Sequence, residues 1–229
     1  MPTAVSPVVL SGRIQPLGPK GHVSGIAKTP TEGPWQITRV GLAGDAQGDL
    51  KHHGGPEKAV HHYPREHYGT WRDEIGAHPL LDAPGAFGEN LSTTGWTEQS
   101  VHIGDVVRFG TAVLQVSQGR QPCWKLNVRF GRDDIAYRTQ TSGRTGWYYR
   151  VLEEGTAARG DDLVLIARPQ PAWPLTRLIT LLYREKDNYS GLREMAAIAE
   201  LADGWRTLAA RRVQAAATED WSSRLNEPQ

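Results

Sequence analysis

The chain has 229 residues, 38% of them hydrophobic, so it can bury one large core or two modest ones. Its 26 basic and 25 acidic residues give a formal charge of +1, which argues against binding a nucleic acid polymer or an anionic membrane by bulk charge. No run approaches the roughly 18 apolar residues of a membrane span, and the N-terminal residues do not resemble a signal peptide, so we expect a cytoplasmic protein.

Short apolar runs with alternating polarity predict β-strands over the first three quarters of the chain. They are VVLSGRIQPL at 8–17, SVHIGDVVRFG at 100–110, TAVLQVSQ at 111–118 and DDLVLIAR at 161–168. Helical segments are predicted at 65–74 and 133–139. Strands spaced in this way, with glycine-rich inserts between them, favour a mainly β fold with a closed or nearly closed barrel over residues 1–168.

The last quarter of the chain has a different composition. Of the 25 glycines, 23 lie within residues 1–170, and only Gly191 and Gly204 follow. Apolar residues at helical spacing after Pro174 predict a first helix, residues 190–200 a second, and Asp203 is the expected N-cap of a third. We therefore predict a linker at 169–174 and a C-terminal three-helix domain at 175–229. This domain either covers the barrel or pairs with a second copy in a homodimer.

Five of the eight histidines lie in the segment KHHGGPEKAVHHYPREHY, residues 51–68. The spacing of a zinc site is absent, which argues against a metal held by protein ligands alone. His61 and His67 are interpreted as structural. His53 precedes two glycines, which let backbone amides and an imidazole approach one ligand, so a ligand-binding role and a structural role both stay open. The segment GLAGDAQGD at 41–49 is interpreted as a tight connection.

The loop QGRQPCWKLN, residues 118–127, holds the single cysteine of the chain, Cys123. One cysteine cannot form an internal disulfide or hold an iron–sulfur cluster that needs several thiolates. Arg120 and Lys125 flank this thiol and favour its thiolate, the form that binds soft metals. Alternatively, Cys123 is an inert buried residue.

The stretch from Arg120 to Arg150 contains seven basic residues against Asp133 and Asp134, a local charge of +5. Such an excess predicts an anion-binding site, because arginine, lysine and backbone amides bind phosphate groups. The alternative is a solvated basic face.

Several motifs together resemble the MOSC domain family, named after the C-terminal domain of molybdenum cofactor sulfurases, and in particular its YiiM-like branch. The motifs are SGIAK at 24–28, GDAQGD at 44–49, HGGPEKAVHHYPREHY at 53–68, FGENLS at 87–92, QVSQGRQPCWKLN at 115–127 and TGWYYRV at 145–151. With the helical tail, the likeness runs the length of the chain. It implies a β-barrel core, a C-terminal three-helix domain and a molybdopterin-type molybdenum cofactor.

The resemblance also implies an activity and a set of site residues. Similar members reduce N-hydroxylated compounds, including 6-hydroxylaminopurine, to amines. Cys123 stands at the position of the molybdenum ligand, and cofactor or pocket contacts are expected from Lys28, His53, Arg120, Lys125 and Asn127. His61 stands where a cysteine can appear in the family and is given no role. Desulfuration of cysteine is not expected, because 229 residues leave no room for the pyridoxal-phosphate half of a sulfurase.

The resulting hypothesis is a reduction in which the oxygen of an N–OH group passes to reduced molybdenum while His53 protonates the departing nitrogen. A separate reductase must supply electrons, because the sequence has neither a flavin motif nor the cysteines for a cluster. The alternative is a carrier that receives sulfur or the cofactor, with a persulfide on Cys123, and has no catalysis of its own.

Overall fold

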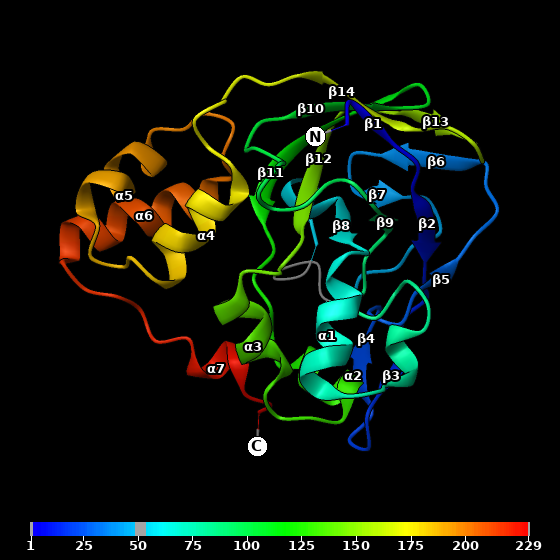
Figure 1. Ribbon diagram of the computed structural model, residues 1–229, viewed down its shortest axis with the longest axis horizontal. Coiled ribbons are helices and arrows are strands. Elements are labelled where there is room, and N and C mark those ends of the chain that lie inside the picture. Colours follow the sequence, from blue (N-terminus) through cyan, green and yellow to red (C-terminus); the bar gives the residue numbers. More distant parts are fainter. Residues whose placement is uncertain (1, 49–53, 229) are drawn as a thin grey trace.

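The alternating pattern of the sequence produces a large mixed sheet in the computed structural model, which describes residues 2–48 and 54–228 (Figure 1). Its nine described strands form eight neighbouring pairs, of which the β8–β9 pair is parallel and the other seven are antiparallel. The strands lie in the order β1 (Ala4–Val5), β14 (Leu163–Ala167), β10 (Val106–Phe109), β11 (Ala112–Gly119), β12 (Trp147–Glu153), β8 (Val60–Pro64), β9 (Leu91–Thr93), β2 (Val8–Ser11) and β5 (Thr29–Pro30).

The central hairpin shows why these residues form strands. Val107 on β10 lies opposite Leu114 on β11, and both side chains are buried. Gly110 makes the turn with a φ of 59°, and a Cβ there would lie 2.2 Å from the Thr156 carbonyl oxygen. Alternation therefore fixes the face of each strand that enters the core, and glycine permits the close turn.

The sheet is not closed in the part of the chain that the structure describes, so of the predicted closed or nearly closed barrel the closed form is not observed. Its edge strands β1 and β5 do not pair with each other. Both are two residues long, and β5 contains Pro30, which has no N–H to donate to another strand. The mixed, mainly β class is confirmed.

Two smaller sheets accompany the large one. Their strands are β13 (Gly155–Ala157), β6 (Trp35–Thr38) and β7 (Gly41–Leu42) in one sheet, and β3 (Gln15–Leu17) and β4 (His22–Ser24) in the other.

Three helices gather at the end of the sheet that carries the cysteine loop: α1 (His67–Ile75), α2 (Lys125–Phe130) and α3 (Ile135–Ser142). Two 3-10 turns, η1 (Pro56–Lys58) and η2 (Pro79–Leu81), lie in the neighbouring loops. Tyr63, Trp71, Phe87 and Phe130 belong to a second apolar core here. The helices predicted at 65–74 and 133–139 correspond to α1 and α3, whereas α2 was not predicted.

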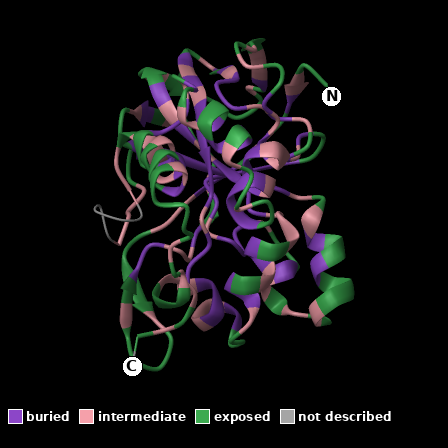
Figure 2. Ribbon diagram, turned by 90° about the vertical axis from the view of Figure 1, so that its left-hand side faces the viewer, coloured by how far each residue is buried: buried purple, intermediate pink, exposed green. Residues whose placement is uncertain are grey.

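The C-terminal helices are α4 (Leu175–Tyr183), α5 (Tyr189–Ala196) and α6 (Asp203–Ala215). The predicted second helix ends four residues too late, and the N-cap of α6 is Ala202 rather than Asp203. Leu178 of α4 and Trp205 of α6 share one core with the strands, and the Trp205 ring lies 3.1 Å from where a Cβ of Gly119 would stand. These helices therefore pack on the sheet through their apolar faces, while their outer faces are exposed (Figure 2).

A short fourth helix, α7 (Ser222–Leu225), lies away from these three, beside α3 at the foot of the molecule in Figure 1. The domain boundaries stay a prediction. No helix of the described residues combines the length and the apolar character needed to cross a lipid bilayer.

Candidate functional site

A cavity opens beside Cys123 where several loops meet residues of β4, β8 and β12, and we call it the Cys123 cavity. Its empty volume, counted out to the open mouth, is about 570 Å³. Its described lining residues are Ser24, Gly25, Ile26 and Lys28; Ala46, Gln47 and Gly48; Lys58, His61 and Tyr148; Phe87, Gly88 and Asn90; and Arg120, Cys123 and Lys125. Segments far apart in the sequence therefore surround one thiol.

Cys123 lies in the loop that joins the end of β11 to the start of α2, and its side chain lines the cavity with only 7% of the residue exposed. Lys125 is the first residue of α2, and its ammonium group donates to the Val23 carbonyl at 3.1 Å. Arg120 follows β11 directly. The structure thus brings Cys123, Arg120 and Lys125 together with Lys28, four of the residues singled out from the sequence.

Four cations line the cavity, Lys28, Lys58, Arg120 and Lys125, and its described lining contains no Asp or Glu. Lys28 forms an ion pair with Asp45, whose side chain is 4% exposed. Burial lowers the pKa of Lys28, and the Asp45 carboxylate opposes that shift. An excess of positive charge in a partly enclosed space favours an anionic ligand.

Three lining residues carry a buried polar atom that has no hydrogen-bond partner within the protein: Gln47 Oε1, His61 Nε2 and Arg120 Nη1. His61 and Arg120 are 4% and 6% exposed. Leaving such an atom without a partner costs about 1–3 kcal/mol. Three of these atoms lie around one cavity, where a ligand with hydrogen-bonding groups would supply the partners that they lack.

His61 is a site residue that the sequence reasoning missed. It precedes His62 on β8, and neighbouring residues of a strand face opposite sides. His61 faces the cavity beside the ring of Tyr148, with ring centroids 4.9 Å apart. Burial and then positively charged Arg120 hold its pKa well below the usual value, so the ring is neutral at pH 7. The period-two alternation along β8 was the signal that could have separated the two histidines.

The segment 41–49 is more than the expected tight connection, because Ala46, Gln47 and Gly48 form part of the cavity wall. A Cβ on Gly25 would lie 2.0 Å from the Ala46 carbonyl oxygen. Glycine at this position therefore allows two wall segments to approach one another.

Asn127 is not among the described residues that line the cavity, and its expected contact with the cofactor stays a prediction. Its amide donates to the carbonyls of Asp133 at 2.9 Å and Leu225 at 3.0 Å. Its carbonyl oxygen accepts the Ala136 N–H at 2.7 Å. Asn127 therefore joins α2 to α3 and to the C-terminal residues. His53 and His52 lie outside the described residues, so the role of His53 stays a prediction.

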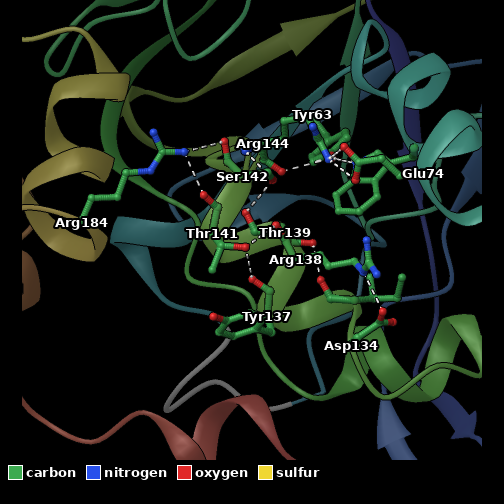
Figure 3. Close-up of polar contacts among 12 residues, drawn as sticks. Tyr63, Glu74, Asp134, Tyr137, Arg138, Thr139, Thr141, Ser142, Arg144 and Arg184 are labelled. Atoms are coloured by element: carbon green, nitrogen blue, oxygen red, sulfur yellow. Dashed lines mark hydrogen bonds and ion pairs between the residues drawn. The ribbon is translucent and has the colours of Figure 1, made fainter.

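Most of the basic stretch from 120 to 150 lies away from the cavity, so the anion site predicted over the whole stretch is reduced to Arg120 and Lys125. Figure 3 shows Arg138 bonded to Asp134 and Arg144 to Glu74. Arg150 pairs with Glu57, and Arg129 donates to two backbone carbonyls. These arginines are held by partners within the protein.

Two observations concern metal binding. His67 Nε2 lies 2.7 Å from a carboxylate oxygen of Glu98, in agreement with its structural interpretation. Among the residues that the structure describes, no group of three or more His, Cys, Asp or Glu side chains is arranged to hold a metal ion. The soft donor that the cavity offers is the Cys123 sulfur.

Comparison with known proteins identifies the class that this fold and site define. The family model for the MOSC domain matches residues 49–164, and the model for the YiiM-like 3-alpha helix domain matches residues 173–216. The chain therefore belongs to the MOSC domain family, in its YiiM-like branch.

Individual relatives agree with this assignment. The protein YiiM of Escherichia coli (strain K12) is 41% identical over 218 residues, which are 95% of this chain and 96% of that protein. The crystal structure of YiiM from Escherichia coli superposes with a TM-score of 0.84 and 32% identity in the structural alignment, covering 99% of this chain and all of that one. A protein of Gibberella moniliformis named "Reductase" is 42% identical over 72% of this chain, which is 30% of its own length.

Proposed function

We propose that this protein is a molybdenum-cofactor-dependent reductase that converts N-hydroxylated compounds, such as 6-hydroxylaminopurine, to amines. The observation that carries the proposal is the Cys123 cavity, in which one thiol lies among four cations. Three polar atoms of the lining, Gln47 Oε1, His61 Nε2 and Arg120 Nη1, have no hydrogen-bond partner within the protein. The relative in Gibberella moniliformis named "Reductase" supports an enzymatic role. Membership of the MOSC family supports the choice of cofactor.

The residues of the cavity fit such a cofactor. A thiolate is a soft anionic donor suited to molybdenum, and a pterin dithiolene brings two further sulfurs of the same kind. The anionic end of the cofactor would pair with Arg120, Lys125 and Lys58, because phosphate groups are bound by guanidinium and ammonium groups. The atoms Gln47 Oε1, His61 Nε2 and Arg120 Nη1 would gain the hydrogen bonds that they lack.

When bound, the molybdenum centre supplies two electrons and accepts oxygen. The protein's own groups bind and orient the N–OH group. Burial raises the pKa of Tyr148, so its hydroxyl stays protonated at pH 7 and can donate a hydrogen bond. The neutral ring of His61 adds no positive charge beside the thiol. The proton for the departing nitrogen is assigned to His53, and the electrons to a separate reductase.

The proposal is tested on wild-type and Cys123→Ala protein, each purified from a host that makes the cofactor. Molybdenum per chain is measured by elemental analysis, and reduction of 6-hydroxylaminopurine is measured with an artificial electron donor. We expect Cys123→Ala to lose at least about tenfold in both, because the metal loses its protein ligand. Wild-type protein from a host without cofactor synthesis is the matched control.

The same measurements separate the enzyme from a carrier. Equal molybdenum in both proteins contradicts the role of Cys123. Bound molybdenum without turnover favours a carrier of the cofactor, and a 32 Da adduct on metal-free Cys123 favours a carrier of sulfur.

A further inference from the structure

The chain turns back toward the Cys123 loop after the three-helix region. The match to the 3-alpha helix domain ends at residue 216, where Ala216 terminates α6 with a φ of 47°. Residues 217–228, which we call the C-terminal strap, then leave the helices and carry α7 to the foot of the molecule (Figure 1). The strap lies outside both matched family models, and the sequence had placed it in the helical domain.

Arg224 of the strap contacts the backbone on both sides of Cys123. Its guanidinium donates to the Pro122 carbonyl, and its own carbonyl accepts the Trp124 N–H at 2.8 Å. The guanidinium also donates to Gln140 Oε1 on α3 at 2.6 Å. One half-buried arginine thus holds the peptide groups before and after the proposed metal ligand and fixes them to a helix.

Two further contacts fix the position of the strap beside the cysteine loop. The Leu225 carbonyl accepts from Asn127 Nδ2 at 3.0 Å, and Glu227 lies 2.6 Å from His22 Nε2. The His22 ring in turn packs edge-on against Trp124, with centroids 4.6 Å apart. The strap therefore joins the β3–β4 hairpin, the cysteine loop and the start of α2, from which Lys125 reaches the cavity.

We infer that Arg224 is a positioning residue that holds the Cys123 loop in the conformation that presents the thiol to the cavity. The inference deepens the proposed function, because it rests on Cys123 being the molybdenum ligand. A loop without secondary structure between Gly119 and Lys125 has few backbone bonds of its own, so bonds from a distant segment determine its conformation. The competing interpretation is that the strap only adds to the stability of the fold.

The test compares Arg224→Met, Arg224→Lys and the control Arg211→Met, all as full-length chains. Methionine keeps the aliphatic part of the side chain and removes its donors, whereas lysine can still donate to the Pro122 carbonyl. Arg211 is exposed on α6, away from the loop. Three quantities are measured: amide hydrogen exchange at Trp124, the rate at which iodoacetamide alkylates Cys123 at pH 7 in cofactor-free protein, and molybdenum per chain after cofactor loading.

For Arg224→Met we expect amide exchange at Trp124 and alkylation of Cys123 to rise about five- to tenfold, and retained molybdenum to fall by a similar factor. Arg224→Lys should show smaller changes than Arg224→Met in all three quantities. A general loss of stability would not produce this partial recovery. Arg211→Met should match wild type. If Arg224→Met fails to fold, Arg224→Lys against wild type still tests the inference, because a single ammonium nitrogen replaces the two guanidinium nitrogens that bond Pro122 and Gln140 separately.

Exchange and alkylation rates in Arg224→Met equal to those of Arg211→Met would overturn the inference. A lower melting temperature with an unchanged loop would also overturn it and would favour the purely stabilising interpretation. The two loop measurements use cofactor-free protein, so they are independent of the proposed function. A loosened loop in Arg224→Met together with full molybdenum in Cys123→Ala would refute the function and leave the strap contact standing.

Discussion

Two groups of basic residues in this protein have similar charge and opposite surroundings. In the Cys123 cavity, Arg120 keeps a buried guanidinium nitrogen without a partner, and no described lining residue is acidic. Around α3, Arg138 and Arg144 face the carboxylates of Asp134 and Glu74 (Figure 3). A count of charges along the sequence does not distinguish the two groups. The charged partners do, because Arg138 and Arg144 bond carboxylates within the protein, although Arg144 Nε also lacks a hydrogen-bond partner. Arg120 meets no acidic residue in the described lining of the cavity, so its charge favours an anionic ligand there.

Neighbouring histidines repeat the contrast on one strand. His62 has both ring nitrogens engaged, with the Tyr149 hydroxyl at 3.1 Å and Thr93 Oγ1 at 2.8 Å. His61 leaves Nε2 without a partner beside the cavity. One histidine completes the interior of the sheet, and the other faces a space for a ligand.

The largest expected effect separates the two arginine groups. Arg120→Ala should weaken cofactor retention about 10- to 100-fold, because hydrogen bonds to charged groups are worth about 1.5–3 kcal/mol. Arg138→Ala, which removes one surface ion pair, should retain the cofactor as wild type does. Retention is measured as molybdenum per chain after gel filtration. Equal losses in the two variants would remove the distinction between the groups.

A second prediction concerns pH and His62. Burial lowers the pKa of His62 to about 3, below the value of 6.5 expected when the chain is unfolded. The contribution of His62 to stability is therefore complete above pH 6.5 and decreases as the pH falls toward 3, because the unfolded chain takes up the proton first. From pH 6.5 to pH 5 the free energy of unfolding should fall by about 2 kcal/mol from this group alone.

Urea unfolding of wild type and His62→Gln at both pH values measures this contribution. Glutamine does not titrate, so the free energy of unfolding should decrease by about 2 kcal/mol less in the variant than in wild type between pH 6.5 and pH 5. An identical decrease in both proteins would show that His62 is not the group responsible.

A smaller effect is expected from Arg144, which is one of the arginines paired within the protein. Its guanidinium bonds Glu74 at 2.7 and 2.8 Å and lies 4.4 Å from the centre of the Trp71 ring. Arg144→Met should lower the free energy of unfolding by about 1–2 kcal/mol and leave cofactor retention unchanged. Urea denaturation and molybdenum analysis test the two halves of this statement. A variant that loses cofactor retention but keeps its free energy of unfolding would place Arg144 among the residues that bind the cofactor.

The smallest effect is expected at His61. His61→Leu removes a polar atom that has no partner, so the unfolding free energy of the cofactor-free protein should change by less than about 1 kcal/mol. Cofactor retention should fall about fivefold, because one hydrogen bond to the ligand is lost. Both the free energy of unfolding and cofactor retention are measured on His61→Leu. A large loss of stability with normal cofactor retention would make His61 a structural residue like His62.

Local sequence patterns determined the mainly β class, the position of α4 and the closeness of Arg120 and Lys125 to Cys123. Alternation, helical spacing and flanking charge act between residues close in the chain, so they can be recognised without a fold. The same reasoning does not determine what depends on a distant partner. The described sheet does not close, because β1 and β5 pair with β14 and β2 and not with each other, and Asn127 bonds Leu225, 98 residues away in the sequence.

Only the tertiary structure decided which charged and polar groups surround the thiol. Lys28 and Gln47 reach the Cys123 cavity from loops about 75–95 residues before Cys123 in the chain, and His61 reaches it through the register of β8. Arg144, which follows α3, pairs with Glu74, and Arg150 of β12 pairs with Glu57, and neither arginine lines the cavity. Sequence shows which groups can ionise or donate, but the folded neighbours determine which of them are already satisfied and which remain available to a ligand.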